Sequence, residues 1–193
     1  MTIADAVALY RANGSGSASP ALREVINQLI DGNVKTEFEN DSYLDALTLT
    51  DVMFHRSNTS VRLLTGPGLD GFLSELQKSF IDLLDRLKKT GGAVRILLLS
   101  KDVPTWLHDL TKAYDKTLTI HRALPTKPMP HFIVCDSKMS RQEEVHEAIT
   151  DASDATTIKA RVSFNETSKA EVLENYFDLM WKSVSDYPIN QAS

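Results

Sequence analysis

Residues 94–99, with the sequence VRILLL, decide the fold that this chain can adopt. Five of the six side chains are apolar, which is typical of a strand that is buried on both faces of a sheet. Gly91 and Gly92 precede this run, and the stretch from Leu69 to Leu87 before them carries apolar side chains at three- and four-residue steps. This spacing predicts a helix of about five turns. A short apolar run at residues 61–64 predicts another strand, so strand and helix alternate in this part of the chain.

The alternating pattern continues toward the C-terminus. A second helix is predicted by the spacing of Trp106, Leu107, Leu110 and Tyr114. Strands are predicted at residues 118–124, 132–135 and 158–164, with a polar segment at 140–156, and a last helix covers 172–181. This order predicts an α/β sandwich with a mixed, largely parallel central sheet flanked by helices.

The first 55 residues have a different character. Apolar side chains at helical spacing predict a short helix at residues 3–10, and the Gly- and Ser-rich stretch 13–19 interrupts it. A second helix is predicted to begin at Ser19-Pro20, with Ser19 as the cap, and to end at Gly32. We therefore expect an N-terminal helical extension (1–55) that packs on an α/β domain (56–193).

Composition excludes several classes of protein. The 193 residues carry a formal net charge of −5, and the single cysteine, Cys135, excludes an intramolecular disulfide framework and a cysteine-based zinc site. No apolar run approaches the 18 residues of a membrane span, and the N-terminus lacks the pattern of a secretory signal, so we expect a cytoplasmic protein. The mild acidity gives no electrostatic reason to expect tight binding of long nucleic acid or of a membrane.

Candidate site residues gather near the ends of two predicted strands. His131 begins the strand 132–135 and Asp136 ends it, with Arg141 following closely. Ser163 and Asn165 alternate with apolar neighbours, so both point to one face of their strand. Together these side chains favour a pocket that accepts an anion.

Each residue also has a purely structural interpretation. Asp136 is suited to accept hydrogen bonds from turn N–H groups, and Arg141 can pair with Glu143 or Glu144 at the surface. Ser163 and Asn165 can cap the last helix, because Ser and Asn are good caps. Cys135, in mid-strand, is expected to be a packed thiol. His55, His108, His121 and His146 are scattered without the spacing of metal ligands, so we expect no metal site.

Residues 60–184 resemble one half of the phospholipase D superfamily fold. The signature of that family is H-x-K-x-x-x-x-D, followed downstream by G-S-x-N. Aligning the signature aspartate with Asp136 places His131 at the lysine and Met129 at the nucleophilic histidine. In the downstream motif Ser163 and Asn165 match the family, whereas Val162 stands where the family has glycine.

The resemblance implies a site whose catalytic chemistry has degenerated. In active members the histidine attacks phosphorus to form a covalent intermediate, and the lysine and asparagine hold the phosphoryl oxygens. A methionine thioether cannot form that intermediate. We therefore expect a binding or interaction module without a cofactor, whose ligand is held by seven residues: His131, Asp136, Lys138, Arg141, Glu143, Ser163 and Asn165.

Two alternatives remain open. In the first, His131 takes the role of the nucleophile and, with Asp136, makes the chain an active, metal-independent phosphodiesterase or nuclease. An offset of two residues keeps His131 on the same strand face as Met129, which permits this exchange. In the second, the chain is a structural subunit whose N-terminal helices dock on another protein. Single-half members of the superfamily pair to build one site, so the resemblance implies a homodimer or a complex with a homologous half, and a protein or a small phosphate-bearing ligand as partner.

Overall fold

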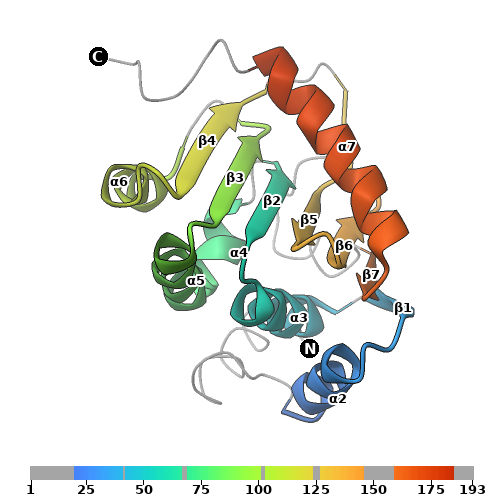
Figure 1. Cartoon of the computed structure of the whole chain (residues 1–193). Coiled ribbons are helices and arrows are strands. Elements are labelled where there is room, and N and C mark those ends of the chain that lie inside the picture. Colours follow the sequence, from blue (N-terminus) through green and yellow to red (C-terminus); the bar gives the residue numbers. More distant parts are fainter. Residues whose placement is uncertain are drawn as a thin grey trace.

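The computed structural model describes residues 20–40, 42–66, 69–100, 103–123, 127–145 and 159–184. Its elements follow one another as shown in Figure 1: α2 (Pro20–Asp31), β1 (Thr36–Asn40), α3 (Tyr43–Arg56), β2 (Ser60–Thr65), α4 (Leu69–Glu75), α5 (Gln77–Thr90), β3 (Ala93–Leu98), α6 (Thr105–Ala113), β4 (Leu118–Arg122), β5 (Phe132–Cys135), β6 (Met139–Glu143), β7 (Ala160–Phe164) and α7 (Thr167–Val184). The predicted helix at residues 3–10 and the cap at Ser19 lie outside the described residues.

In the described part of the chain, seven strands form one mixed sheet in the order β1-β7-β6-β5-β2-β3-β4. Strands β2, β3 and β4 are parallel, as expected for strands joined through helices. The other neighbouring strands, from β1 to β2 across the sheet, are antiparallel. The predicted α/β sandwich is confirmed, but the expectation of a largely parallel sheet is wrong, because β5, β6, β7 and β1 all join by antiparallel pairing.

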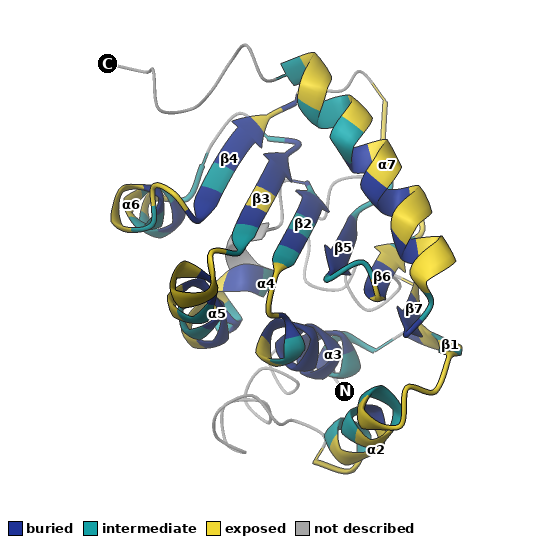
Figure 2. Ribbon diagram, viewed as in Figure 1, coloured by how far each residue is buried: buried dark blue, intermediate teal, exposed yellow. Residues whose placement is uncertain are grey.

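Helices cover both faces of the sheet (Figure 1). Helix α7 crosses one face, and α3, α4, α5 and α6 lie on the other, while α2 packs on the outside of α3. Figure 2 shows that the central strands and most of α3 are buried, whereas α7 turns an exposed face outward and the edge strand β1 is partly exposed. The alternation of side chains along each strand therefore supplies two separate apolar layers.

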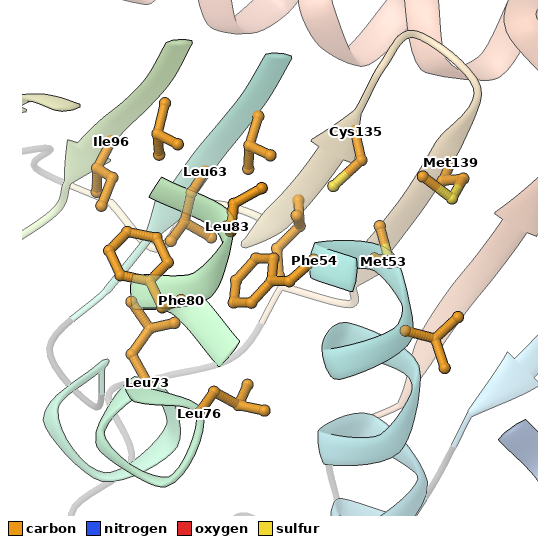
Figure 3. Close-up of a cluster of buried hydrophobic side chains, with 14 of the residues drawn as sticks. Met53, Phe54, Leu63, Leu73, Leu76, Phe80, Leu83, Ile96, Cys135 and Met139 are labelled. Atoms are coloured by element: carbon orange, nitrogen blue, oxygen red, sulfur yellow. The ribbon is translucent and has the colours of Figure 1, made fainter. Parts of the chain in front are cut away.

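The larger core lies between the sheet and helices α3, α4 and α5. Figure 3 shows Phe54 from α3 and Phe80 from α5 among strand side chains such as Leu63 and Ile96. The rings of Phe54 and Phe80 lie 5.6 Å apart between centroids, and neither side chain is exposed. A smaller core beneath α7 contains Phe132, Phe177, Leu64 and Leu97. The strand 94–99 thus contributes side chains to both layers, as its apolar sequence predicts.

The local predictions differ from the structure at α3, at the helix expected over residues 69–87, at β1 and at β6. Helix α3 was not predicted, because its residues 46–54 are all buried and leave no amphipathic spacing. The helix expected at residues 69–87 is divided at Leu76 into α4 and α5, and α5 ends at Gly91, whose φ of +76° suits glycine. Strand β1 was not predicted, because its sequence TEFEN is short and contains one apolar residue, Phe38. Strand β6 lies mostly in the predicted polar segment 140–156. It was not recognised as a strand because its sequence MSRQE is polar, although Arg141 is buried in the structure.

Helix α2 is attached to the rest of the fold by apolar contacts and by ion pairs with α3. Ile26 is 1% exposed within the larger core. Arg23 pairs with Asp51 of α3, whose carboxylate is fully buried and also accepts a hydrogen bond from Ser79 of α5. A buried carboxylate is tolerated only with such partners, so α2, α3 and α5 are held in one arrangement.

Candidate functional site

Six of the seven predicted site residues lie in two groups at opposite ends of the sheet, and Ser163 lies in neither group. His131 directly precedes β5 and Asp136 directly follows it, so the strand separates them. Glu143 of β6 lies opposite Ala160 of β7, and Ala160 lies opposite Asn40 of β1. The backbone N–H of Glu143 also donates to the His131 carbonyl, so these residues share the end of the sheet at which His131 lies. Lys138 and Asn165 lie at the other end, beyond the register pair Met139 and Phe164. The structure therefore does not bring the seven candidates together.

At the first end four side chains form a network that we call the strand-end cluster: Asn40, His131, Arg141 and Glu143. Arg141 Nη1 donates to Glu143 Oε1 at 2.5 Å, and Arg141 Nε donates to Asn40 Oδ1 at 3.2 Å. His131 Nδ1 lies 3.3 Å from Glu143 Oε2. One carboxylate thus contacts both basic side chains. Arg141 is only 5% exposed, so this pairing compensates the cost of burying its charge.

The imidazole of His131 lies against Gly66, where β2 leads toward α4. A Cβ at Gly66 would lie 2.6 Å from His131 Nε2, which is closer than nonbonded atoms approach. Glycine is therefore required at residue 66 for His131 to hold its position beside Glu143. The contact places the ring at the C-terminal end of a parallel strand, where α/β proteins commonly bind ligands.

Met129 occupies a different environment from the strand-end cluster. Its side chain is partly buried and packs against the smaller core beneath α7. The residue that the resemblance aligns with the nucleophile thus has a packing contact and a thioether that cannot act as that nucleophile.

At the second end Asp136 acts as an acceptor for the chain that leads into β2. Its Oδ2 accepts from the backbone N–H of Asn58 at 2.8 Å, and its Oδ1 accepts from those of Thr59 and Ser60 at 2.9 Å. The Thr59 hydroxyl also donates to Oδ1, at 2.8 Å. With four donors on two oxygens, this carboxylate is occupied by structural hydrogen bonds.

A cavity of about 370 Å³, which we call the polar pocket, opens beside Asp136. It is lined by residues from α2, α3, the β5–β6 turn and the end of β7: Ile30, Asn33, His55, Arg56, Asn58, Asp136, Lys138, Met139 and Asn165. Three of the sequence candidates, Asp136, Lys138 and Asn165, are among them. The other residues that line the polar pocket were not predicted, because no sequence motif connects the C-terminal ends of two helices with a distant turn.

Asn165 and Ser163 have structural partners. Asn165 Nδ2 donates to the carbonyls of Leu29 and Val34, both at 3.1 Å, and so ties the end of α2 to β7. Ser163 lies within the sheet, where its hydroxyl is 2.7 Å from that of Ser140, and both residues are buried. Ser163 therefore belongs to neither end of the sheet.

In the described ranges, neither Cys135 nor the remaining histidines build a further site, and His146 lies outside those ranges. Cys135 is buried, and burial raises the pKa of its thiol to about 12, so it is a packed thiol as predicted. Burial, followed by the nearby Arg23 and Arg86, lowers the pKa of His55. Within the described ranges no three His, Cys, Asp or Glu side chains are placed to hold a metal ion. In the same ranges no helix has the length and apolar content needed to cross a membrane.

Comparison with solved structures identifies the architecture. The archaeal chromatin protein TrmBL2, whose structure shows a novel mode of DNA binding, superposes with a TM-score of 0.57 at 19% identity over 86% of this chain. The chain spans 60% of the length of TrmBL2. No family model matches the sequence, and no curated protein matches it either.

Two further similar structures are matched over nearly their whole length. NucT from Helicobacter pylori has a TM-score of 0.57 at 14% identity, covering 78% of this chain and 96% of NucT. Nuc from Salmonella typhimurium, a phospholipase D family member, has a TM-score of 0.50 at 14% identity, covering 80% of this chain and 96% of Nuc. The chain therefore has a phospholipase D-like fold.

Proposed function

We propose that this phospholipase D-like domain has lost phosphodiester cleavage and binds a phosphate-bearing ligand at the strand-end cluster. The carrying observation is that one carboxylate, Glu143, contacts both Arg141 and His131. Guanidinium and imidazole groups that converge on one carboxylate are equally suited to a phosphate group, which is a larger acceptor with similar geometry. Met129 supplies no nucleophile in this arrangement.

The pairing with Glu143 also explains how a ligand would be selected. A ligand must compete with the resident carboxylate, so a dianionic phosphate is favoured over a monoanion with fewer acceptor oxygens. Binding a phosphate beside Glu143 brings like charges together, and this repulsion limits the affinity.

The experiment removes the competing charge without changing the shape of the side chain. In Glu143→Gln the affinity for inorganic phosphate, measured by isothermal titration calorimetry, is expected to rise about tenfold, equivalent to about 1.4 kcal/mol. The double variant Arg141→Gln, Glu143→Gln replaces the ion pair with two amides and is expected to lose phosphate binding. Its thermal unfolding is recorded to show that the domain remains folded.

Glu144→Gln is the matched control, because it makes the same change at the next residue, whose side chain is exposed. It is expected to leave phosphate affinity unchanged. Equal effects of Glu143→Gln and Glu144→Gln would show that only overall charge matters, and the proposal would then fail.

A second candidate function is supported by the contact between His131 and Glu143. A carboxylate at Nδ1 orients the imidazole so that Nε2, which faces Gly66, carries the lone pair that the nucleophile of a metal-independent phosphodiesterase needs. In this candidate Asp136, which aligns with the signature aspartate, keeps the structural role of accepting hydrogen bonds from residues 58–60. This candidate predicts hydrolysis of bis-(p-nitrophenyl) phosphate that is abolished in His131→Ala and reduced in Glu143→Gln.

The two candidates respond oppositely to the same substitution. Glu143→Gln strengthens phosphate binding in the binding module but removes the orienting carboxylate from the phosphodiesterase. Absence of turnover by the purified wild-type protein at every pH from 5 to 8 would eliminate the second candidate.

We also propose that the domain works as a cytoplasmic homodimer or beside a homologous half. TrmBL2 supports a nucleic-acid ligand by its DNA binding, whereas the net charge of −5 favours a small ligand or a protein partner over long nucleic acid. Sedimentation equilibrium of the full chain tests the homodimer. A monomer at all concentrations would exclude the homodimer. Deletion of residues 1–18 tests the remaining candidate, a structural subunit, because loss of assembly with a folded core would support it.

A further inference from the structure

We propose that the polar pocket is a second binding site, separate from the strand-end cluster, and that it holds the phosphate group of a small organic phosphate. It lies at the opposite end of the sheet, so its occupant cannot be the ligand of the strand-end cluster. The proposal does not depend on the proposed function. It rests on the fixed walls of the pocket, on its cationic side chains and on its volume.

The walls are fixed by polar side chains that bind the backbone of neighbouring segments. Asp136 holds the backbone of residues 58–60, and Asn165 holds the carbonyls of Leu29 and Val34. Asn33, Asp136 and Asn165 all have left-handed backbones, with φ of 50°, 51° and 58°. Asn and Asp tolerate this conformation better than other non-glycine residues. These residues keep the end of α2, the end of α3 and the β5–β6 turn at set positions.

The two cationic side chains that line the pocket, Lys138 and Arg56, take no part in the hydrogen bonds that fix its walls. Lys138 is exposed and has no ion pair with any residue in the described ranges. Arg56 pairs with Asp31, but the Asp31 side chain is 64% exposed, so a ligand can compete for the guanidinium. An ammonium and a guanidinium facing one cavity repel each other, and a dianion between them removes that repulsion.

The other lining groups suit the remainder of a small metabolite. Asn165 Nδ2 donates to the carbonyls of Leu29 and Val34, which leaves Oδ1 of this residue as an acceptor, whereas Asn58 Nδ2 already donates to the Arg56 carbonyl. Ile30 and Met139 add an apolar part to the lining. A cavity of about 370 Å³ lies within the size range of small-molecule sites and exceeds what a phosphate group alone fills.

The test follows amide resonances of the ¹⁵N-labelled full chain while inorganic phosphate or ribose 5-phosphate is added. Saturable shifts are expected at residues 31–34, 56–59, 136–139 and 165–166, with tighter binding of ribose 5-phosphate. Lys138→Gln and Arg56→Gln are each expected to weaken this binding about fivefold to tenfold. Lys159→Gln, an exposed lysine before β7 at the opposite end, is the matched control and is expected to change nothing.

Three outcomes would overturn the proposal. These are shifts that do not saturate, equal shifts in potassium chloride of matched ionic strength, and unchanged affinity in Lys138→Gln. The result is separable from the proposed function, because Glu143→Gln acts on the strand-end cluster alone. Phosphate binding that responds to Glu143 but not to Lys138 rejects the pocket and keeps the cluster, and the reverse pattern rejects the cluster and keeps the pocket.

Discussion

The two ends of the sheet use the same kinds of side chain in opposite ways. At the strand-end cluster the Glu143 carboxylate pairs with basic side chains, so positive and negative charges neutralise each other. At the polar pocket the Asp136 carboxylate binds backbone N–H groups instead, and Arg56 and Lys138 are left to face a cavity. A carboxylate that accepts hydrogen bonds from the backbone leaves neighbouring cations able to bind a ligand, whereas a carboxylate that pairs with those cations competes with the ligand.

The largest effect is expected when the carboxylate at the polar pocket is removed. Asp136→Ala leaves three backbone N–H groups and a hydroxyl without their acceptor and puts alanine at a φ of +51°. The free energy of unfolding, measured with urea, should fall by about 3 kcal/mol. Asp136→Asn keeps one acceptor oxygen and tolerates the backbone, so it should lose about half as much. Equal stability of wild type and Asp136→Ala would contradict the structural role.

A smaller loss of unfolding free energy is expected at the strand-end cluster, when the close contact between Gly66 and His131 is disturbed. Gly66→Ala places a methyl group 2.6 Å from His131 Nε2, so the ring must move away from Glu143. Overpacking of this kind costs about 1–3 kcal/mol. In a His131→Ala background the methyl group has room, so the same substitution should cost little. Urea unfolding of the four proteins gives the coupling energy, and additive costs would show that the contact does not matter.

The sequence predicted the elements whose apolar pattern is strong. The strand 132–135 was predicted with its observed bounds, and the strand 94–99 was shifted by one residue from β3. Strand β6 could not be recognised because Arg141 is polar in sequence and becomes buried only through Asn40 and Glu143. Glu143 lies two residues away on the same strand, but Asn40 comes from β1, and no local pattern reveals that this distant residue contacts Arg141.

The candidate site was predicted less completely than the fold. The chemistry of His131, Arg141 and Glu143 was anticipated, and the structure brings these three together. Asp136 and Asn165 were grouped with them because they share the signature, but the antiparallel pairing of β5 with β6 and of β6 with β7 carries them to the other end. Arg56 gave no signal, since a basic residue in the last turn of a helix is common.

Ser163 offers a test between the two ends, because it was a ligand candidate and lies in neither site. Ser163→Ala removes one hydroxyl of the buried Ser140–Ser163 pair and should lower the free energy of unfolding by about 1 kcal/mol. Adding Ser140→Ala removes the orphaned partner and should restore part of that loss. Phosphate affinity should be unchanged in both variants, and a weakened affinity would return Ser163 to the binding site.

The smallest effect is a pH dependence that reports the burial of His55 and the charged groups around it, beside the polar pocket. Burial lowers the pKa of His55 from 6.5, and Arg23, Arg86 and Lys78 lower it further, while Asp82 raises it. Below pH 6.5 the unfolded chain binds a proton that the folded protein still excludes, so the free energy of unfolding should fall until the pH reaches the folded pKa. His55→Gln should flatten this decline in urea unfolding between pH 7.5 and 5, whereas His108→Gln on α6 should not. If a phosphate occupies the pocket, its negative charge raises the pKa of His55, and the decline should begin less steeply in phosphate than in chloride. A steeper decline in phosphate would contradict the placement of an anion near this histidine.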